Sequence, residues 1–235
     1  MNNARRGAAS AFAPSRIAPS CIAPSSIVPS LIVPSLIVMA KQPKAGAVKR
    51  RLARGIGAVA AAGFHRTTLR HTLIRLGPDP RWRTYLAVTP DSALAGSCWP
   101  SWPRVPRIPQ GQGNLGARMQ ALFDRMPPGP VVLVGSDIPA ISPDHIAEAL
   151  RLLGQADAVF GPARDGGYWL VGFKRSPGRL APFHEVPWST DQALAATCAN
   201  LKRRRIAFAA TLSDVDKAED FKSQRGLAER LVRPS

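Results

Sequence analysis

The feature that most constrains the fold is a short apolar run that ends abruptly at an acid. Residues 131–139 read VVLVGSDIP, so aliphatic residues give way to a glycine, a serine and Asp137. An apolar run of this length indicates a buried strand of a parallel sheet. Because ligands of open α/β sheets bind just beyond the carboxyl ends of the strands, Asp137 is expected at a functional site. The alternatives are a plain turn residue or the N-cap of a helix that begins near Ser142.

Apolar strands and helical stretches alternate along most of the chain. We expect strands over residues 36–40, 84–89, 107–108, 131–135, 157–160, 167–173 and 205–211. Helices are expected over residues 47–54, 57–76, 114–126, 143–153, 190–203 and 217–231. Strands that alternate with helices predict a single domain with three α/β/α layers and a mostly parallel mixed sheet. A chain of 235 residues is long enough for one such domain with a sizeable core.

The first 40 residues carry a five-residue repeat that does not fit this pattern. From residue 14 onward, Pro-Ser recurs at every fifth position, and the last copy runs into the strand expected at 36–40. Proline at this spacing blocks both a helix and a central strand. We therefore divide the chain into a poorly ordered Pro/Ser/Ile extension, 1–33, and a folded domain, 34–235. A duplicated coding repeat explains the extension better than a secretory signal, because prolines interrupt its apolar residues.

Composition narrows the classes of function. Lysine and arginine outnumber acidic residues 32 to 15, which gives a formal net charge of +17 and suggests a polyanionic ligand. No zinc-finger spacing, helix-turn-helix pattern or aromatic RNA-binding signature accompanies this charge, so we expect no specific nucleic acid. The three cysteines form no CxxC pair, which indicates neither a zinc site nor a disulfide framework and fits a cytoplasmic protein. Prolines interrupt the longest apolar stretch, so we expect no transmembrane segment.

A basic loop follows the first strand. Residues 41–52 read KQPKAGAVKRRL, and residues 41–54 hold six cations and no acid. A glycine-containing loop before a helix presents free backbone N–H groups to an anion, and lysine or arginine adds charge-assisted contacts. The loop, with Lys41, Gly46, Lys49 and Arg51, is therefore a candidate phosphate site, although it matches neither a Walker A motif nor GxGxxG. A solvated basic helix face is the alternative.

A glycine-rich segment precedes the helix expected at 114–126. Residues 110–118 read QGQGNLGAR. Glycine lets the backbone approach a flat ligand, and asparagine caps helices, so Gln110, Gly113 and Asn114 are candidates for nucleotide binding. A plain glycine-rich turn with an N-cap explains the same residues.

A second acid, Asp165, lies between two expected strands. Residues 161–170 read GPARDGGYWL. Asp165 is a candidate to bind sugar hydroxyls or to act as a base, and the adjacent glycines, Gly166 and Gly167, would give a substrate close access. The alternative is a hairpin turn, which Asp-Gly commonly forms.

Two further acids follow the last expected strand, where residues 211–216 read TLSDVD. Asp214 and Asp216 can share a metal ion to which Asp137 supplies a third oxygen, and Mg²⁺ or Mn²⁺ favours such ligands. Alternatively, Asp216 caps a helix that holds Glu219 in a capping box. No nucleophilic triad is apparent, and we expect the four histidines, His65, His71, His145 and His184, to be surface or packing residues.

Taken together, these segments resemble the radical-SAM/selenodomain-associated transferases. The members of this GT-A-like family are expected to be glycosyltransferases. The matching motifs cover about residues 36 to 222 in collinear order. They are Ala40-Lys41-x-Pro43 with Gly46-x-Val48-Lys49-x-Arg51-Leu52, Gln110-Gly-x-Gly-x-Leu115-Gly116-x-Arg118, Gly135-Ser136-Asp137-x-Pro139, Asp165-Gly-Gly-Tyr168, Pro187-Trp188-Ser189-Thr190, and Asp214-Val215-Asp216 with Glu219-Asp220. The chain departs from the family pattern at Ala45, Arg50 and Asn114, where proline, threonine and aspartate are usual.

The resemblance implies a GT-A/Rossmann-like fold. It also implies a nucleotide-diphospho-sugar transferase that binds a nucleotide or nucleotide-sugar donor and a divalent metal. On this basis Asp137 and Asp165 are the expected catalytic residues. Gly166, Gly167, Tyr168, Trp188, Ser189 and Thr190 are expected to bind a small-molecule or lipid acceptor. Two alternatives stay open. One is a nucleotidyltransferase similar to the phospholactate guanylyltransferases, and the other is a non-catalytic module that binds anions or nucleic acid.

Overall fold

The computed structural model describes residues 32–96, 99, 104–174, 181–216 and 218–223. These residues belong to a compact unit that spans Ile32–Ser235. Most of the extension predicted over residues 1–33, together with Cys21 and Cys98, lies outside the described residues. Across the part of the chain that is described, no helix is long and apolar enough to cross a membrane.

Seven strands form one sheet in the order β3-β2-β1-β4-β6-β5-β7. The strands are β1 (Ser35–Lys41), β2 (Arg83–Thr89), β3 (Arg107–Pro109), β4 (Val131–Gly135), β5 (Ala158–Pro162), β6 (Tyr168–Phe173) and β7 (Ile206–Phe208). Strand β1 is an inner strand that pairs in parallel with β2 and β4, whereas β6 runs antiparallel to both β4 and β5. The mostly parallel mixed sheet predicted from the sequence is confirmed, and β1 and β4 end at the same edge.

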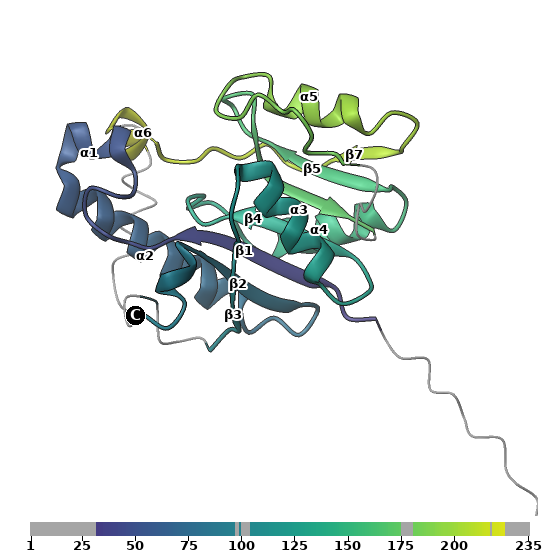
Figure 1. The fold of residues 1–235 in the computed structure, drawn as a ribbon, viewed down its shortest axis with the longest axis horizontal. Helices are drawn as coiled ribbons and strands as arrows, with labels where there is room; N and C mark the ends of the chain where they lie inside the picture. The colour runs from purple at the N-terminus through teal and green to yellow at the C-terminus, as the bar shows by residue number, and fades with distance from the viewer. Residues whose placement is uncertain (1–31, 97–98, 100–103, 175–180, 217, 224–235) are drawn as a thin grey trace, which may run out of the picture. The chain divides into compact units, whose positions relative to one another are not determined.

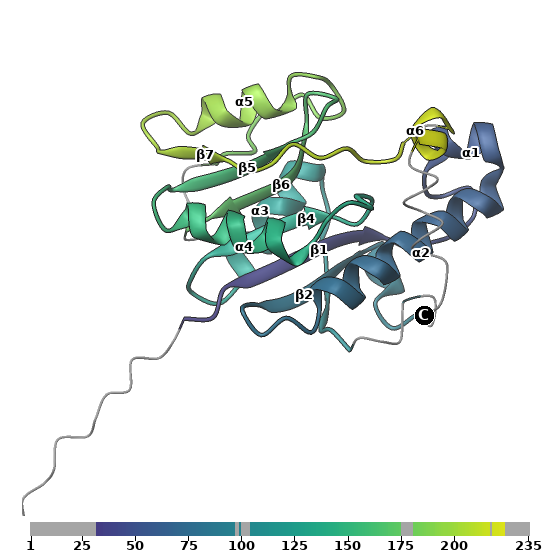
Figure 2. The ribbon, with the colours of Figure 1, turned by 180° about the vertical axis from the view of Figure 1, so that it is seen from behind.

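Helices cover both faces of this sheet (Figures 1 and 2). They are α1 (Arg50–Ile56), α2 (Ala58–Leu76), α3 (Leu115–Arg125), α4 (Pro143–Leu153), α5 (Ala193–Asn200) and α6 (Ala218–Ser223), with a short 3₁₀ turn η1 (Asp91–Ala93) after β2. Helices α2 and α4 share one apolar cluster with the sheet. Helices α3 and α5 pack into a second cluster with residues of the opposite sheet face. The predicted three-layer architecture is therefore confirmed.

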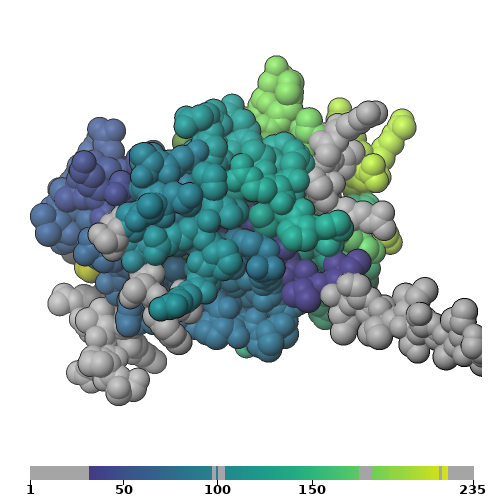
Figure 3. Space-filling view, turned by 60° about the horizontal axis from the view of Figure 1, so that its bottom comes forward, coloured from purple at the N-terminus to yellow at the C-terminus, as the bar shows by residue number. Residues whose placement is uncertain are grey.

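The two clusters follow from the alternation of side chains along the strands. In β1, Leu36 and Val38 face the α2–α4 side, and Ile37 faces the α3 side. All three side chains are fully buried, as expected of an inner strand with helices on both faces of the sheet. In the space-filling view (Figure 3), the segment that leads into β1, in purple, reaches the surface, while blue to teal parts of the chain form most of the visible face. Buried inner strands thus support the loops at the carboxyl edge of the sheet.

Several predicted elements differ in length from the observed ones. Helix α1 begins at Arg50 rather than at residue 47, because Lys49 has the left-handed backbone angle φ 46°. Helix α5 begins at Ala193 rather than at residue 190, because Thr190 forms a turn in which its hydroxyl accepts from Gln192 N–H and donates to the Pro187 carbonyl. Strand β7 ends at Phe208 rather than at residue 211, since its partner β5 becomes irregular at Gly161 and Pro162.

Candidate active site

A cavity of about 840 Å³ opens at the carboxyl edge of the sheet. The end of β1 and the basic loop line one side of it, and the residues after β4 line its floor. The β5–β6 hairpin, the segment before α5 and the acids before α6 complete it. The predicted site residues that line this cavity are Lys41, Lys49, Arg51, Gln110, Asp137, Asp165, Gly167, Tyr168, Trp188, Ser189, Thr190, Asp214 and Asp216. Gly46, Gly113, Asn114 and Gly166 lie outside its lining.

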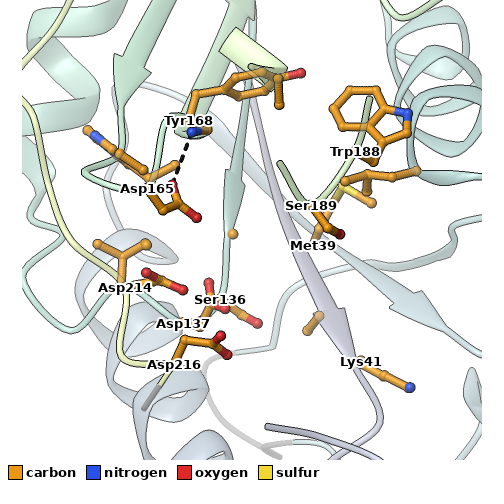
Figure 4. A pocket seen from close by; sticks show the side chains of 18 of the residues that line it. Met39, Lys41, Ser136, Asp137, Asp165, Tyr168, Trp188, Ser189, Asp214 and Asp216 are labelled. Carbon is orange, nitrogen blue, oxygen red and sulfur yellow. Dashed lines mark hydrogen bonds between the residues drawn. The ribbon is translucent and has the colours of Figure 1, made fainter. Parts of the chain in front are cut away.

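The ammonium group of Lys49 lies at the centre of three carboxylates. Its Nζ atom is 2.8 Å from Asp137 Oδ2, 3.8 Å from Asp214 Oδ2 and 3.9 Å from Asp216 Oδ1. The Lys49 side chain is only 7% exposed, whereas each carboxylate keeps about a third of its surface open, 36% for Asp137 and 33% for the other two. Figure 4 shows the three acids directed toward one another. We call Asp137, Asp214 and Asp216 the carboxylate cluster.

Local structure explains how residues far apart in sequence meet here. Asp137 follows β4 after a single serine, and Gly135 leaves room for its carboxylate, because a Cβ there would lie 2.9 Å from Asp137 Oδ1. Val215 is fully buried, and its backbone N–H points to the Asp137 carbonyl at 3.4 Å. This buried valine fixes its two neighbours, Asp214 and Asp216, beside Asp137.

The charges in the cluster shift the pKa values of its members in opposite directions. Burial acts to raise the pKa of Asp137, but the Lys49 ammonium outweighs burial and holds this pKa below its usual range. Burial, together with the negative charges of Asp137, Asp165 and Asp216, raises the pKa of Asp214 to about 6 despite the nearby lysine. Burial lowers the pKa of Lys49, yet the three carboxylates bring it above its ordinary value. The cluster therefore carries more negative charge than one ammonium neutralises.

Removing the charge of Asp214 should stabilise the metal-free protein. The pKa of Asp214 is raised to about 6 in the folded state, so the folded protein binds more protons than the unfolded chain between about pH 4 and 6. Stability is consequently lost as the pH rises through this window, and the full loss is present above it. After allowance for partial exposure of the side chain, we expect Asp214→Asn to raise the free energy of unfolding by about 1–2 kcal/mol at pH 7.5. Each kcal/mol corresponds to a rise of roughly 2–4 °C in the unfolding temperature.

Thermal unfolding with a chelator present measures this gain, which should disappear at pH 4 where wild-type Asp214 is protonated. Glu148→Gln, on the exposed side of α4, is the matched control and should leave the unfolding temperature unchanged. A lower unfolding temperature for Asp214→Asn at pH 7.5 would show that Asp214 does not carry an unfavourable charge.

The basic loop contributes cations to the cavity beyond Lys49. Lys41, the last residue of β1, is exposed and lines the cavity. Arg51 Nη1 lies 3.1 Å from Asp216 Oδ2 in a largely exposed ion pair. Both side chains are therefore accessible from the cavity, and their predicted contact with phosphate stays a prediction.

His65 is a site residue that the sequence did not indicate. It lies in α2, is 5% exposed and lines the cavity, and its Nε2 atom is 2.9 Å from the Lys41 carbonyl oxygen. Because a carbonyl only accepts hydrogen bonds, Nε2 carries the proton, and the buried Nδ1 atom makes no hydrogen bond. Burial lowers the pKa of His65, so the neutral ring holds the end of β1 in place. A single histidine in a helical pattern gave no signal for this role.

Gln110 supports the site rather than offering free groups to a ligand. Its side chain is 2% exposed, and Nε2 donates to the Ala40 and Ala87 carbonyls at 3.2 and 2.9 Å. Its Oε1 atom accepts from Arg118 Nη1 at 2.9 Å. Gln110 thus ties β1 to β2 and orients Arg118, which lines the cavity. Asn114 caps α3 by accepting from Ala117 N–H at 2.9 Å, which is the alternative that the sequence left open.

The β5–β6 hairpin brings Asp165 to the side of the cavity where Asp214 lies, across from Lys41 (Figure 4). Asp165 Oδ1 accepts from Gly167 N–H at 3.0 Å, so the hairpin-turn interpretation also holds. Tyr168 and Trp188 form an aromatic wall, with ring centroids 6.4 Å apart. At the start of α3, Gly116 makes room for this wall, because a Cβ there would lie 2.9 Å from Trp188 Cζ2. The cavity therefore has a charged half at the carboxylate cluster and an aromatic half.

The donor atoms of the carboxylate cluster suit a divalent cation, although their present spacing suits an ammonium. Carboxylate oxygens are the ligands that Mg²⁺ and Mn²⁺ prefer. The three oxygens lie 2.8–3.9 Å from one point, the Lys49 Nζ atom, whereas Mg²⁺ needs about 2.1 Å. Within the described residues, no three acidic, histidine or cysteine side chains are already arranged to hold a metal ion. A metal would require Lys49 to move and the acids to close in.

The sheet order and the position of the cavity define a nucleotide-diphospho-sugar transferase-like fold, and solved structures share it. A candidate nucleotide-diphospho-sugar transferase from Desulfovibrio desulfuricans G20 is 23% identical, with 84% of this chain and 97% of that chain covered and a TM-score of 0.69. A model of the family described as "uncharacterized protein conserved in bacteria (DUF2064)" matches residues 72–190, and the chain belongs to this family. A comparison with curated protein sequences found no match.

Two further solved structures show the same fold at lower identity. The 4-diphosphocytidyl-2C-methyl-D-erythritol synthase from Anaerococcus prevotii DSM 20548 is 12% identical, with 84% of this chain and 98% of that chain covered and a TM-score of 0.56. The molybdopterin-guanine dinucleotide biosynthesis protein A from Archaeoglobus fulgidus is 14% identical, with 83% and 99% covered and a TM-score of 0.51.

Proposed function

We propose that this protein is a metal-dependent transferase that uses a nucleotide-activated donor, and that it transfers a glycosyl group to a small-molecule or lipid acceptor. The observation that carries the proposal is the pairing of a basic loop with the carboxylate cluster in one cavity at the carboxyl edge of the sheet. Cations alone would suit many anions, whereas cations beside three acids suit a diphosphate that arrives with a divalent metal. On this proposal, the resemblance to the radical-SAM/selenodomain-associated transferases extends to activity.

Each group has a distinct role in this proposal. Lys41, Lys49 and Arg51 bind the diphosphate of the donor. Asp137, Asp214 and Asp216 hold Mg²⁺ or Mn²⁺, which when bound would neutralise charge on the leaving diphosphate. Asp165, held by the Gly167 N–H group, orients the acceptor hydroxyl or removes its proton. The protein supplies positioning and electrostatic stabilisation, since the donor is already activated.

The aromatic half of the cavity supports an acceptor site opposite the cations. Tyr168 and Trp188 present ring surface there, and Ser189 and Thr190 border it. Such a wall suits the apolar face of a sugar or a short apolar segment. The acceptor hydroxyl would then lie between this wall and Asp165.

A nucleotidyltransferase is the second candidate, because two structures with the same fold are named as a diphosphocytidyl-methylerythritol synthase and a dinucleotide biosynthesis protein. In that reaction, the acceptor is a phosphorylated small molecule that attacks the α-phosphorus of a nucleoside triphosphate, and pyrophosphate leaves. A non-catalytic module that binds nucleic acid is less well supported, because the acids at the centre of the cavity would repel a phosphate backbone.

The leaving group distinguishes these candidates. Incubation with Mn²⁺ and UDP- or GDP-sugars should release a free nucleoside diphosphate, detected by chromatography, if the protein transfers or slowly hydrolyses glycosyl groups. Incubation with GTP or CTP and a phosphorylated hydroxy acid should release pyrophosphate if it transfers nucleotides. Pyrophosphate release with no nucleoside diphosphate from any sugar donor would rule out the glycosyl proposal in favour of the second candidate.

A further inference from the structure

We propose that the Lys49 ammonium is a built-in cation that fills the metal position of the carboxylate cluster, and that a divalent metal binds there only by displacing it toward the donor phosphates. This inference rests on the proposed function, because it concerns the same metal. It adds that metal and phosphate binding are coupled through one side chain of this protein.

The position of Lys49 is the first support. Nζ is the common neighbour of all three acids, at 2.8, 3.8 and 3.9 Å. Only 7% of the Lys49 side chain is exposed, so the ammonium is enclosed by the acids rather than held at the cavity rim. A divalent cation that contacts all three carboxylates would have to occupy nearly the same point. Two cations at such a short separation repel each other strongly in a partly buried site.

The backbone around Lys49 shows that its placement is specific. Lys49 has a φ of 46°, in the left-handed region that residues other than glycine rarely adopt. The conformation places the residue directly before α1, with the following turn packed through the fully buried Leu52. From this position the side chain turns inward, and its Nζ atom lies 2.8 Å from Asp137 Oδ2. A lysine on an ordinary solvated helix face would not need this conformation.

The four-carbon stem of lysine provides the displacement. Rotation of its side-chain bonds moves the ammonium by several ångströms without backbone movement. The free space next to the cluster is the cavity, which Lys41 and Arg51 also line. Figure 4 shows the acids of the cluster facing this space, with Lys41 across from them. A displaced ammonium would therefore gain a phosphate as its new partner when a nucleotide is present.

Two consequences follow for binding. Without nucleotide, the metal must break the contact between Lys49 and Asp137, which weakens metal binding. With nucleotide, the displaced ammonium binds phosphate, so each ligand strengthens the binding of the other. Lys49 then links arrival of the metal to arrival of the donor.

The test is a titration of Mn²⁺ without nucleotide, followed by electron paramagnetic resonance of the free ion. We expect Lys49→Met to bind Mn²⁺ about tenfold more tightly than the wild type, within the usual range of such couplings. Lys44→Met is the matched control, because Lys44 is exposed in the same loop but does not line the cavity, and its affinity should equal that of the wild type. Adding Asp137→Asn to Lys49→Met should remove the gain.

The outcomes separate this inference from the proposed function. Equal or weaker Mn²⁺ binding by Lys49→Met, with Asp137-dependent binding by the wild type, overturns the inference and leaves the proposed metal site intact. Absence of Asp137-dependent Mn²⁺ binding in every variant overturns both.

If Lys49→Met does not fold, amine labelling of the wild type tests the same point by mass spectrometry. Saturating Mn²⁺ should increase labelling of Lys49 several-fold and leave Lys44 unchanged, since displacement brings a nearly buried amine into the open cavity. Labelling of Lys49 that Mn²⁺ does not change would overturn the inference.

Discussion

Asp137→Asn is expected to lower the metal-dependent affinity for nucleoside diphosphates by at least about 100-fold, or about 2.7 kcal/mol. Asp137 is the acid nearest to the centre of the cluster, and a neutral amide neither attracts a divalent cation nor balances Lys49. Calorimetric titration of UDP, GDP and CDP with Mn²⁺ present measures this loss. The exposed Asp144→Asn, in the first turn of α4, is the control and should leave the affinity unchanged.

The same substitution should also reduce stability. It leaves the nearly buried Lys49 ammonium without its closest partner, although Asp214 and Asp216 remain within 4 Å. We expect a loss of about 1–2 kcal/mol, below the values seen for fully buried pairs, because the Asp137 side chain keeps 36% exposure. Unchanged nucleotide affinity in a folded Asp137→Asn protein would contradict the assigned site.

Gly166→Ala is expected to be the most disruptive single-methyl change near the site. Gly166 has a φ of 82°, and an added Cβ would collide with the backbone of Asp191, at its oxygen, Cα and carbonyl carbon atoms. Backbone atoms cannot rotate away as a flexible side chain can, so the β5–β6 hairpin must separate from the segment before α5. We expect a loss of at least about 3 kcal/mol of folding free energy, larger than the strain of the backbone angle alone.

Function should fall with stability in this variant. The movement displaces Asp165 from one side and Ser189 and Thr190 from the other, although Gly166 itself does not line the cavity. Denaturant unfolding and nucleotide-sugar turnover measure the two effects. Gly63→Ala is the matched control, because no atom lies within 4 Å of its added Cβ on the exposed side of α2. Gly63→Ala should gain about 0.5–1 kcal/mol of folding free energy from helix propensity. An equal change in folding free energy for Gly63→Ala and Gly166→Ala would refute the predicted collision.

The pattern of apolar strands in the sequence predicted much of the fold. The apolar run at 131–135 is β4, and Asp137 lies just beyond it, at the carboxyl edge where ligands of such sheets bind. Asp214 and Asp216 were predicted to join Asp137, and the structure brings all three around one point. The fold prediction succeeded because strand periodicity is a property of local sequence, whereas the metal-binding role of the three acids stays a prediction.

Other features depend on contacts that a single sequence does not reveal. Lys49 is enclosed because acids from other segments of the chain meet around it. In the sequence, this lysine was a candidate only for binding phosphate. The side-chain polar atoms of Gln110 form hydrogen bonds with Ala40, Ala87 and Arg118. Its role is therefore structural, although its glycine-rich context suggested nucleotide contact. His65 gave no sequence signal, because its hydrogen-bond partner is a backbone carbonyl 24 positions away.

The most direct test of the proposed site is calorimetric titration of the wild-type protein with nucleoside diphosphates, first with Mn²⁺ and then with excess chelator. We expect micromolar binding of at least one diphosphate with Mn²⁺, corresponding to about −8 kcal/mol, and at least about 100-fold weaker binding once the metal is removed. Equal affinity with and without the metal, or no binding of any nucleotide, would contradict a metal-dependent nucleotide site at the carboxylate cluster.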